Sequence, residues 1–539
     1  MKTGKTVKVL LTAATAAGML AGCGSKTDTD TFRFASELDI QGMDSTVVDD
    51  GMSFNAIHAI TDGLTAVNEK GKTAPAIAKS WDVSDDGKTY TFHLRDAKWT
   101  NGDKVTANDF VYSWRKIIKD AGNYAYMLGS GGASVKNADA LMELGANATD
   151  EQMATLGVTA KDDKTLVVEL ENKVPYFTDL MAFPCYFPQN EKFVEKCGKN
   201  YGTKPEYTLS NGAYTMTKWI KGNKATFTKN DKYYDAKAVK TKNLEMFLVQ
   251  DPKTAAQNFD NGKVDYATIN STLVDKYKGK DTFTTFNEGY LFYLQLNFKN
   301  NTVANKNVRE ALAYAINRKD LCENVLKDGS MAATGFVPSQ LSKSPAGKDF
   351  RDDADKYVSY DQKKAQEYLD AAKKELGTDT ITIDLLYGTD ESPMDTMAEY
   401  LQGSFSKLKG LKVNMVATVK KDRIYNREAN GNFQVVCTRW GPDYADPTTY
   451  LNLATTDNSN NYGKYTSAKY DALMEQIQKE SDLTKRWDLM IQAEKVIMED
   501  MAYIPVFEKG SAALKAKNVK GLVVVPVGTP YTFKYVKLK

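Results

Sequence analysis

One carboxylate in this sequence has a setting that suggests chemistry, that of Asp443. The apolar run Phe433–Val436 precedes it and predicts a buried strand. We expect the strand to break before Asp443, at Gly441-Pro442, because proline cannot donate to a ladder and glycine tolerates strained angles. Asp443 would then lie beyond a strand end, where α/β folds bind ligands, and could meet a cation there. An aspartate that caps a surface turn fits these residues equally well. Three aromatic residues frame the position: Trp440, Tyr444 and Tyr450.

The chain contains no motif that is typical of metal binding, nucleophilic catalysis or nucleotide binding. With only two histidines, His58 and His93, an HExxH or zinc site is excluded, and the sequence has no CxxC. GxSxG, a P-loop and GxGxxG before a helix are also missing. We therefore expect no metal, no cofactor and no enzymatic activity. A secreted hydrolase whose acid pair is hidden among the many carboxylates is the alternative of another class.

Five cysteines give no clear disulfide pattern. One is Cys23 and the others are Cys185, Cys197, Cys322 and Cys437. The last four allow three pairings, and spacing selects none of them. Cys185 and Cys197 are nearest in sequence, but four free thiols fit equally well.

The amino terminus has the pattern of an export signal. Three lysines precede Val9–Leu20, an apolar run too short to span a bilayer. Leu20-Ala-Gly-Cys23 resembles the lipobox of bacterial lipoproteins, which implies cleavage after residue 22 and a lipid on Cys23. Residues 23–29 read as a polar tether, with a reach of roughly 25 Å when extended. We expect anchoring by lipid alone at the outer face of the cell membrane, and a conventional signal peptide is the alternative.

Charge and length limit the partners. The formal net charge of +2 falls to about −1 once residues 1–22 and their three lysines are removed. A nearly neutral chain argues against nucleic acid or anionic lipid as a partner. More than 500 mature residues predict two or three lobes.

Hydrophobic patterning predicts alternating strands and helices, and hence a largely parallel or mixed sheet with helices on its faces. Thr106-Ala-Asn-Asp109 is typical of a capping box that begins a helix with Phe110, Trp114, Ile117 and Ile118 on one buried stripe. The strands expected are 31–40, 89–95, 381–387, 411–416, 433–437 and 502–507. The further helices expected are 53–64, 394–407, 422–430, 467–479 and 483–498.

Several motifs, taken in order, resemble one family. They are Asp62-Gly-Leu-Thr65, Lys98-Trp-Thr-Asn-Gly-Asp103, Val105–Arg115, Leu209–Tyr214, Val308–Arg318 and Trp440–Leu451. The chain resembles the extracytoplasmic solute-binding proteins of oligopeptide and dipeptide ABC importers over essentially its whole mature length.

The resemblance implies a periplasmic-binding-protein-like α/β fold, with two large lobes joined by a hinge and a smaller extra domain. The expected first domain is discontinuous, and the domains are 30–62 with 189–289 and 507–539, then 63–188, then 290–506. The expected partners are a peptide ligand and the membrane permease and ATPase subunits of an ABC importer. We expect a monomer.

The resemblance also implies site residues. Asp443 would pair with the α-ammonium of the peptide, and Trp440 would form a wall beside it. The backbone of Asp49, Asp50, Gly51 and Met52 would form one edge of a peptide-pairing groove. Tyr124 would reach into the cleft from the second domain.

The carboxylate end of the peptide is less defined. Some relatives use an arginine three residues before the tryptophan, where this chain has Cys437. Arg427 is the predicted substitute. Peptide length stays open, and so does the choice between nutrition and signalling. Relatives of this fold bind oligosaccharides or other solutes, so a non-peptide ligand is the alternative within the fold.

Overall fold

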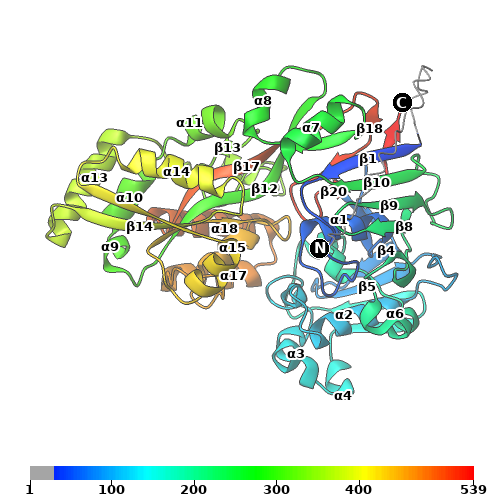
Figure 1. Ribbon diagram of the computed structural model, residues 1–539. Coiled ribbons are helices and arrows are strands. Elements are labelled where there is room, and N and C mark those ends of the chain that lie inside the picture. The colour runs from blue at the N-terminus through cyan, green and yellow to red at the C-terminus, as the bar shows by residue number, and fades with distance from the viewer. Residues whose placement is uncertain (1–29) are drawn as a thin grey trace, which may run out of the picture.

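The computed structural model describes residues 30–539, which form an α/β protein with helices on both faces of a large mixed sheet (Figure 1). The predicted signal, the tether and Cys23 lie outside the described residues. The large sheet has eleven strands in the order β15-β14-β16-β12-β17-β11-β1-β10-β9-β8, with β13 paired to β17. The sheet contains both parallel and antiparallel pairs, which agrees with the predicted mixed sheet.

One end of this sheet is built mainly from the first half of the chain. Its strands are β1 (Thr31–Ser36), β8 (Tyr214–Ile220), β9 (Lys224–Lys229), β10 (Asn243–Leu248) and β11 (Tyr266–Ile269). The helices here are α1 (Gly51–Ile60), α7 (Pro252–Asp260) and α8 (Ser271–Tyr277). The last residues of the chain return to this end as β18 (Val519–Lys520), β19 (Val523–Val524), β20 (Tyr531–Thr532) and β21 (Lys537–Leu538).

The other end carries the longest helices. Its strands are β14 (Ile381–Gly388), β15 (Leu411–Thr418) and β16 (Val435–Trp440). They are covered by α10 (Lys306–Ala315), α13 (Gln362–Leu376), α14 (Met394–Phe405), α17 (Ala468–Lys479) and α18 (Leu483–Glu499). The predicted helix 422–430 is a π-helix over Arg423–Glu428 that follows the short α15 (Lys420–Asp422).

A separate four-stranded sheet lies below the first end in Figure 1. It has the order β4 (Ala78–Val83), β5 (Thr89–Leu94), β7 (Thr165–Glu169), β6 (Val158–Asp162) and is packed by α2 (Ala107–Lys119). The predicted capping box is confirmed, since the Thr106 N–H donates to Asp109 Oδ2 at 2.8 Å. All four members of the predicted stripe on α2 are buried.

Two long strands join the two ends of the large sheet. β12 (Phe283–Leu296) and β17 (Tyr503–Lys515) are antiparallel partners, and their register is interrupted between Asn287 and Leu291. The predicted domain borders at 289/290 and 506/507 lie inside these two strands. Gly289 in the interruption has φ +81°, and a Cβ there would lie 1.9 Å from the Pro526 carbonyl oxygen, so only glycine fits.

The apolar core forms three large clusters rather than one. The first lies within residues 291–507, the second mainly within 54–186, and the third is assembled from 32–60, 187–266 and 513–538. No helix among the described residues is long and apolar enough to cross a membrane. The four described cysteines are free thiols.

Candidate ligand-binding site

A cavity of about 400 Å³, the main cavity, opens between the first and second core clusters, and it is lined by Tyr293 of the first and Phe54 of the second. Its walls come from the start of α1, from residues 124–126, from the crossing strand β12, from β16 and the turn after it, and from the loop 525–530. Segments far apart in sequence therefore converge on one hollow beside the two strands that join the sheet ends.

Asp443 lies in the wall of this cavity without a cation beside it. Tyr126 OH donates to Asp443 Oδ2 at 3.0 Å, and the Asp443 N–H donates to Thr449 Oγ1 at 3.2 Å. Within residues 30–539, no lysine, arginine or histidine lies within ion-pair distance of this carboxylate. Burial raises the pKa of Asp443 from 3.8 to about 6, and the Tyr126 hydrogen bond opposes the rise. The site thus holds a negative charge that is poorly solvated and is not neutralised.

The turn that carries Asp443 follows β16 directly. β16 extends to Trp440, three residues beyond the predicted end at Cys437, because Leu291–Leu296 of β12 supply ladder partners along its whole length. Trp440 is therefore the last strand residue rather than part of the turn. The absence of a Cβ at Gly441 lets the Tyr290 ring pack there, since a Cβ would lie 2.5 Å from that ring.

The far end of the main cavity holds a cluster of buried charges. Arg423 pairs with Glu391 through its Nη2 at 2.7 Å and also with Glu428, and its Nη1 donates to Thr438 Oγ1 at 2.8 Å. Arg439 Nε lies 3.5 Å from Glu391 Oε1 and its guanidinium stacks over Tyr290. Burial raises the pKa of Glu428 to about 7 in spite of Arg423. We name these four residues, Glu391, Arg423, Glu428 and Arg439, the ionic cluster.

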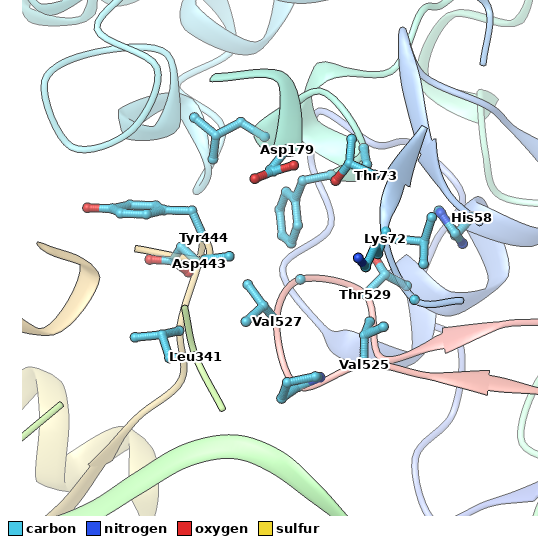
Figure 2. Close-up of a pocket in the computed structure, with 18 of the residues that line it drawn as sticks. His58, Lys72, Thr73, Asp179, Leu341, Asp443, Tyr444, Val525, Val527 and Thr529 are labelled. Atoms are coloured by element: carbon cyan, nitrogen blue, oxygen red, sulfur yellow. The ribbon is translucent and has the colours of Figure 1, made fainter. Parts of the chain in front are cut away.

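A second hollow of about 340 Å³, the side cavity, adjoins the first and shares Asp443, Phe183 and the loop 525–528 with it. Figure 2 shows Asp443 and Tyr444 on one wall and His58, Lys72 and Thr529 on the opposite one. Val527 lies between the two walls.

Comparison with known proteins identifies the family. Residues 72–462 match the family described as bacterial extracellular solute-binding proteins, family 5 Middle. The chain belongs to this family. It is 34% identical to the dipeptide-binding protein of Lactococcus lactis subsp. cremoris (strain MG1363), with both chains covered in full. It is 32% identical to the oligopeptide-binding protein OppA of Bacillus subtilis (strain 168), over 90% of this chain and 88% of that one.

A solved structure shows the same fold. Listeria monocytogenes OppA bound to peptide superposes with a TM-score of 0.79 at 33% identity, over 95% of this chain and 100% of that one. The predicted periplasmic-binding-protein-like fold is therefore confirmed, and so is the predicted family.

In this family 5 protein, two predicted aromatic residues line the main cavity. Trp440 is partly buried, and its indole Nε1 has no hydrogen-bond partner among the described residues. Tyr124 packs edge-on against Phe54, with ring centroids 5.1 Å apart. The other two aromatics of the motif lie elsewhere. Tyr444 stacks on Tyr176, and Tyr450 is buried with its OH donating to the Gly289 carbonyl at 2.6 Å.

The predicted edge Asp49–Met52 has a mixed placement. Asp49 and Gly51 line the main cavity. Asp50 caps α1 by accepting the Ser53 N–H at 2.8 Å, and Met52 is buried in the first turn of that helix. The segment thus reaches the cavity at the beginning of a helix and only partly as extended backbone.

The predicted Arg427 lies outside the lining of the main cavity. Its Nε lies 3.2 Å from Asp422 Oδ2. The π-helix turns Arg423 inward instead, and the strand β16 presents Arg439.

Sequence reasoning also missed Tyr126 and the loop 525–530. Tyr126 follows the predicted Tyr124 by two residues, and a short 3-10 helix over Ala125–Met127 brings both rings to the cavity. The run Val525-Pro-Val-Gly-Thr-Pro530 has the composition of a turn, which was the one available signal for the loop.

Proposed function

We propose that this protein captures peptides in the main cavity and delivers them to an ABC permease in the membrane. The names of the relatives support peptide as the ligand class, since they are a dipeptide-binding protein, an oligopeptide-binding protein and a homologue solved with peptide bound. A binding role without catalysis fits the family.

The observation that carries the proposal is the unpaired charge of Asp443. A carboxylate removed from water without a cation is costly, and a ligand ammonium that pairs with it recovers that cost. Tyr126 holds one oxygen in place by its 3.0 Å hydrogen bond and leaves the other free for a ligand. A peptide supplies an α-ammonium whatever its side chains, so one fixed carboxylate serves many sequences.

The backbone of the peptide would pair with the free edge of β16. The ladder between β16 and β14 ends at Leu386–Val436, so residues 437–440 have a strand partner only on the β12 side within the described chain. An extended peptide can add to such an edge through main-chain hydrogen bonds. The indole N–H of Trp440, at the end of this edge, is available for a ligand carbonyl. We retain the backbone at Asp49–Gly51 as the opposite contact.

Closure would follow from the three predicted domains. The three core clusters support a division into 30–62 with 189–289 and 507–539, then 63–188, then 290–506. β12 and β17 are the two crossings, and bending at their interrupted register would bring the lobes together around the ligand. A lipid on Cys23 would keep this monomer at the outer face of the membrane, near its permease.

Isothermal titration calorimetry with trialanine and N-acetyl-trialanine tests the ammonium contact. The wild-type protein should bind trialanine at least a hundredfold more tightly than the acetylated peptide, because removing one partner of a buried pair costs about 3–5 kcal/mol. Asp443→Asn should bind trialanine as weakly as the wild type binds the acetylated form. Equal affinity of the wild-type protein for both peptides would overturn the assignment of Asp443.

A thermal-shift screen separates peptide from other solutes. A ligand that binds only the folded state raises the melting temperature, so peptides should do so and neutral oligosaccharides should not. Mass spectrometry of the same incubations should recover every peptide uncleaved. Peptide fragments would instead favour the hydrolase alternative.

A further inference from the structure

The point where the described chain begins is surrounded by lysines. The Lys242 N–H donates to the Asp30 carbonyl at 2.9 Å, so residues 237–242 lie beside the start of β1. Thr241 Oγ1 donates to the Val536 carbonyl at 2.6 Å, which brings the last residues of the chain to the same place. Figure 1 shows the carboxy terminus beside the beginning of β1. Five exposed lysines belong to these segments and form what we name the lysine face: Lys237, Lys240, Lys520, Lys537 and Lys539.

The five lysines are not neutralised by neighbouring acids. Within residues 30–539, none of them has a carboxylate within ion-pair distance. Three carboxylates in this region are each matched by a separate lysine, in the pairs Asp30–Lys242 at 2.7 Å, Asp281–Lys517 at 2.7 Å and Asp235–Lys534 at 2.8 Å. The α-carboxylate of the terminal Lys539 offsets one of the five charges, and the lysine face still has a surplus of positive charge.

One pair within the face is unfavourable by itself. Lys520 and Lys537 lie directly opposite each other in the β18–β21 ladder. Like charges at opposed positions of an antiparallel pair destabilise it, because their side chains begin only about 5 Å apart. An anionic surface in front of the pair would remove this repulsion.

The surplus is local. Residues 30–539 together carry a formal charge of about −1, so the remaining surface is net negative. The average charge of the chain argued against anionic lipid as a partner, but the fold gathers lysines from three distant segments onto one face. A molecule with this asymmetry is oriented by a charged surface.

We propose that the lysine face rests on the anionic lipid headgroups of the membrane. The seven residues that link Asp30 to the proposed lipid site at Cys23 span roughly 25 Å at most, so the face stays within reach of the bilayer. Lysines near an anionic leaflet are attracted over about a Debye length, near 10 Å at 0.1 M salt. The contact would orient the protein on the membrane. It draws on the proposed tether for placement, but it does not depend on the peptide site.

Vesicle flotation tests the contact between the lysine face and the membrane in a protein that lacks the lipid anchor on Cys23. We would use residues 23–539 with Cys23→Ser, and vesicles of phosphatidylcholine alone or with 30 mol% phosphatidylglycerol. The protein should float with the phosphatidylglycerol vesicles at 50 mM salt, remain behind with pure phosphatidylcholine, and be released at 500 mM salt. Changing Lys237, Lys240, Lys520 and Lys537 to Gln should lower binding more than tenfold, since each lysine near such a surface contributes roughly fivefold.

A matched control removes the same charge from the other end of the sheet. Lys306, Lys356, Lys374 and Lys412 are exposed there and are changed to Gln together. This control should float as the unsubstituted chain does, and both quadruple variants should bind trialanine unchanged. Failure of the parent chain to float with phosphatidylglycerol vesicles, or an equal loss in both variants, would overturn the proposal. Either result would leave peptide binding by Asp443 untouched, so the two proposals fail separately.

Discussion

At the scale of the residue, the site depends on a charge kept out of water. Asp443 accepts one hydrogen bond from Tyr126 and has no cationic neighbour within the described chain. The neutral tyrosine donor fixes the geometry without cancelling the charge. The unliganded protein at neutral pH therefore holds an electrostatic cost that a ligand cation relieves.

This arrangement predicts a pH dependence of peptide affinity. The pKa of Asp443 is about 6 in the free protein, and an ammonium beside it favours the ionised form and lowers that pKa. Binding then expels a proton below pH 6, so the dissociation constant should be about tenfold higher at pH 5 than at pH 7. Above about pH 8 the peptide amine loses its own proton and affinity should fall again. Calorimetry across pH 5–9 measures the loss of affinity on both the acidic and the alkaline side.

The same residue supplies the control. In Asp443→Asn, the rise in the dissociation constant below pH 6 that is due to Asp443 should disappear. Any pH dependence of affinity that is due to Glu428, whose pKa is about 7, should persist. Because the folded pKa of Asp443 is raised, its ionisation destabilises the unliganded protein above about pH 4. Asp443→Asn should thus raise unfolding stability at pH 7, by on the order of 1 kcal/mol after allowance for partial exposure. A lower stability would mean that Asp443 has a structural role instead.

At the scale of the element, the sequence predicted helix caps and helix bounds better than the pairing of strands that are distant in sequence. The capping box of α2 and the bounds of α17 and α18 follow from local spacing, and the structure has them nearly as predicted. β17 runs eight residues beyond its predicted end at 507, because its partners β11 and β12 are distant in sequence. The position of Asp443 came from a motif, but the absence of a nearby cation emerges only in three dimensions. Arg427 was predicted from the family resemblance, and the inward position of Arg423 depends on a π-helix of which the sequence gives no sign.

The ionic cluster links three elements, and we expect its loss to destabilise the fold. Arg423 joins the loop at Glu391, the π-helix at Glu428 and the strand β16 at Thr438. Arg423→Met should cost about 3–5 kcal/mol of unfolding free energy at pH 8, because it leaves the buried Glu428 without a cation and leaves Glu391 with Arg439 alone. Urea denaturation measures the loss.

The protonation of Glu428 provides a separate check of this prediction. Burial already raises the pKa of Glu428 to about 7, and without Arg423 this carboxyl takes up a proton at pH 5, so the loss caused by Arg423→Met should be smaller there than at pH 8. Arg423→Lys keeps a charge but not the bidentate geometry, and its loss should be intermediate. A loss that is the same at both pH values would indicate that packing, not charge, holds these elements.

At the scale of the whole molecule, the segment Asp443–Tyr444 both lines the proposed ligand site and contacts the opposite lobe. Asp443 meets Tyr126, and the next residue, Tyr444, stacks on Tyr176 with ring centroids 4.2 Å apart and planes within 2°. Tyr176 packs against the core cluster of residues 54–186, and Tyr126 contacts Tyr124, which packs against the same cluster. The motif itself belongs to β16 and its turn. The proposed pairing with a peptide ammonium would therefore occur at a contact between the two sides of the cleft.

This coupling predicts that Tyr176 controls affinity without touching the ligand. Tyr176 lines neither cavity. Tyr176→Ala removes the stack, which is worth about 0.5–1.5 kcal/mol beyond its buried area, and so lowers the population of the closed form. The apparent dissociation constant for trialanine should rise about two- to tenfold, because it scales inversely with the closed fraction. The dissociation rate, followed by stopped flow, should rise with it.

The matched control for Tyr176→Ala keeps the aromatic ring at position 176. Tyr176→Phe retains the stack on Tyr444 and should bind trialanine as the wild type does, which separates closure from any effect of the hydroxyl. Small-angle scattering should show a larger radius of gyration for unliganded Tyr176→Ala than for Tyr176→Phe. If Tyr176→Ala closed as fully and bound as tightly as Tyr176→Phe, the stack would be a passive contact. The hinge strands β12 and β17 would then set the closed state alone.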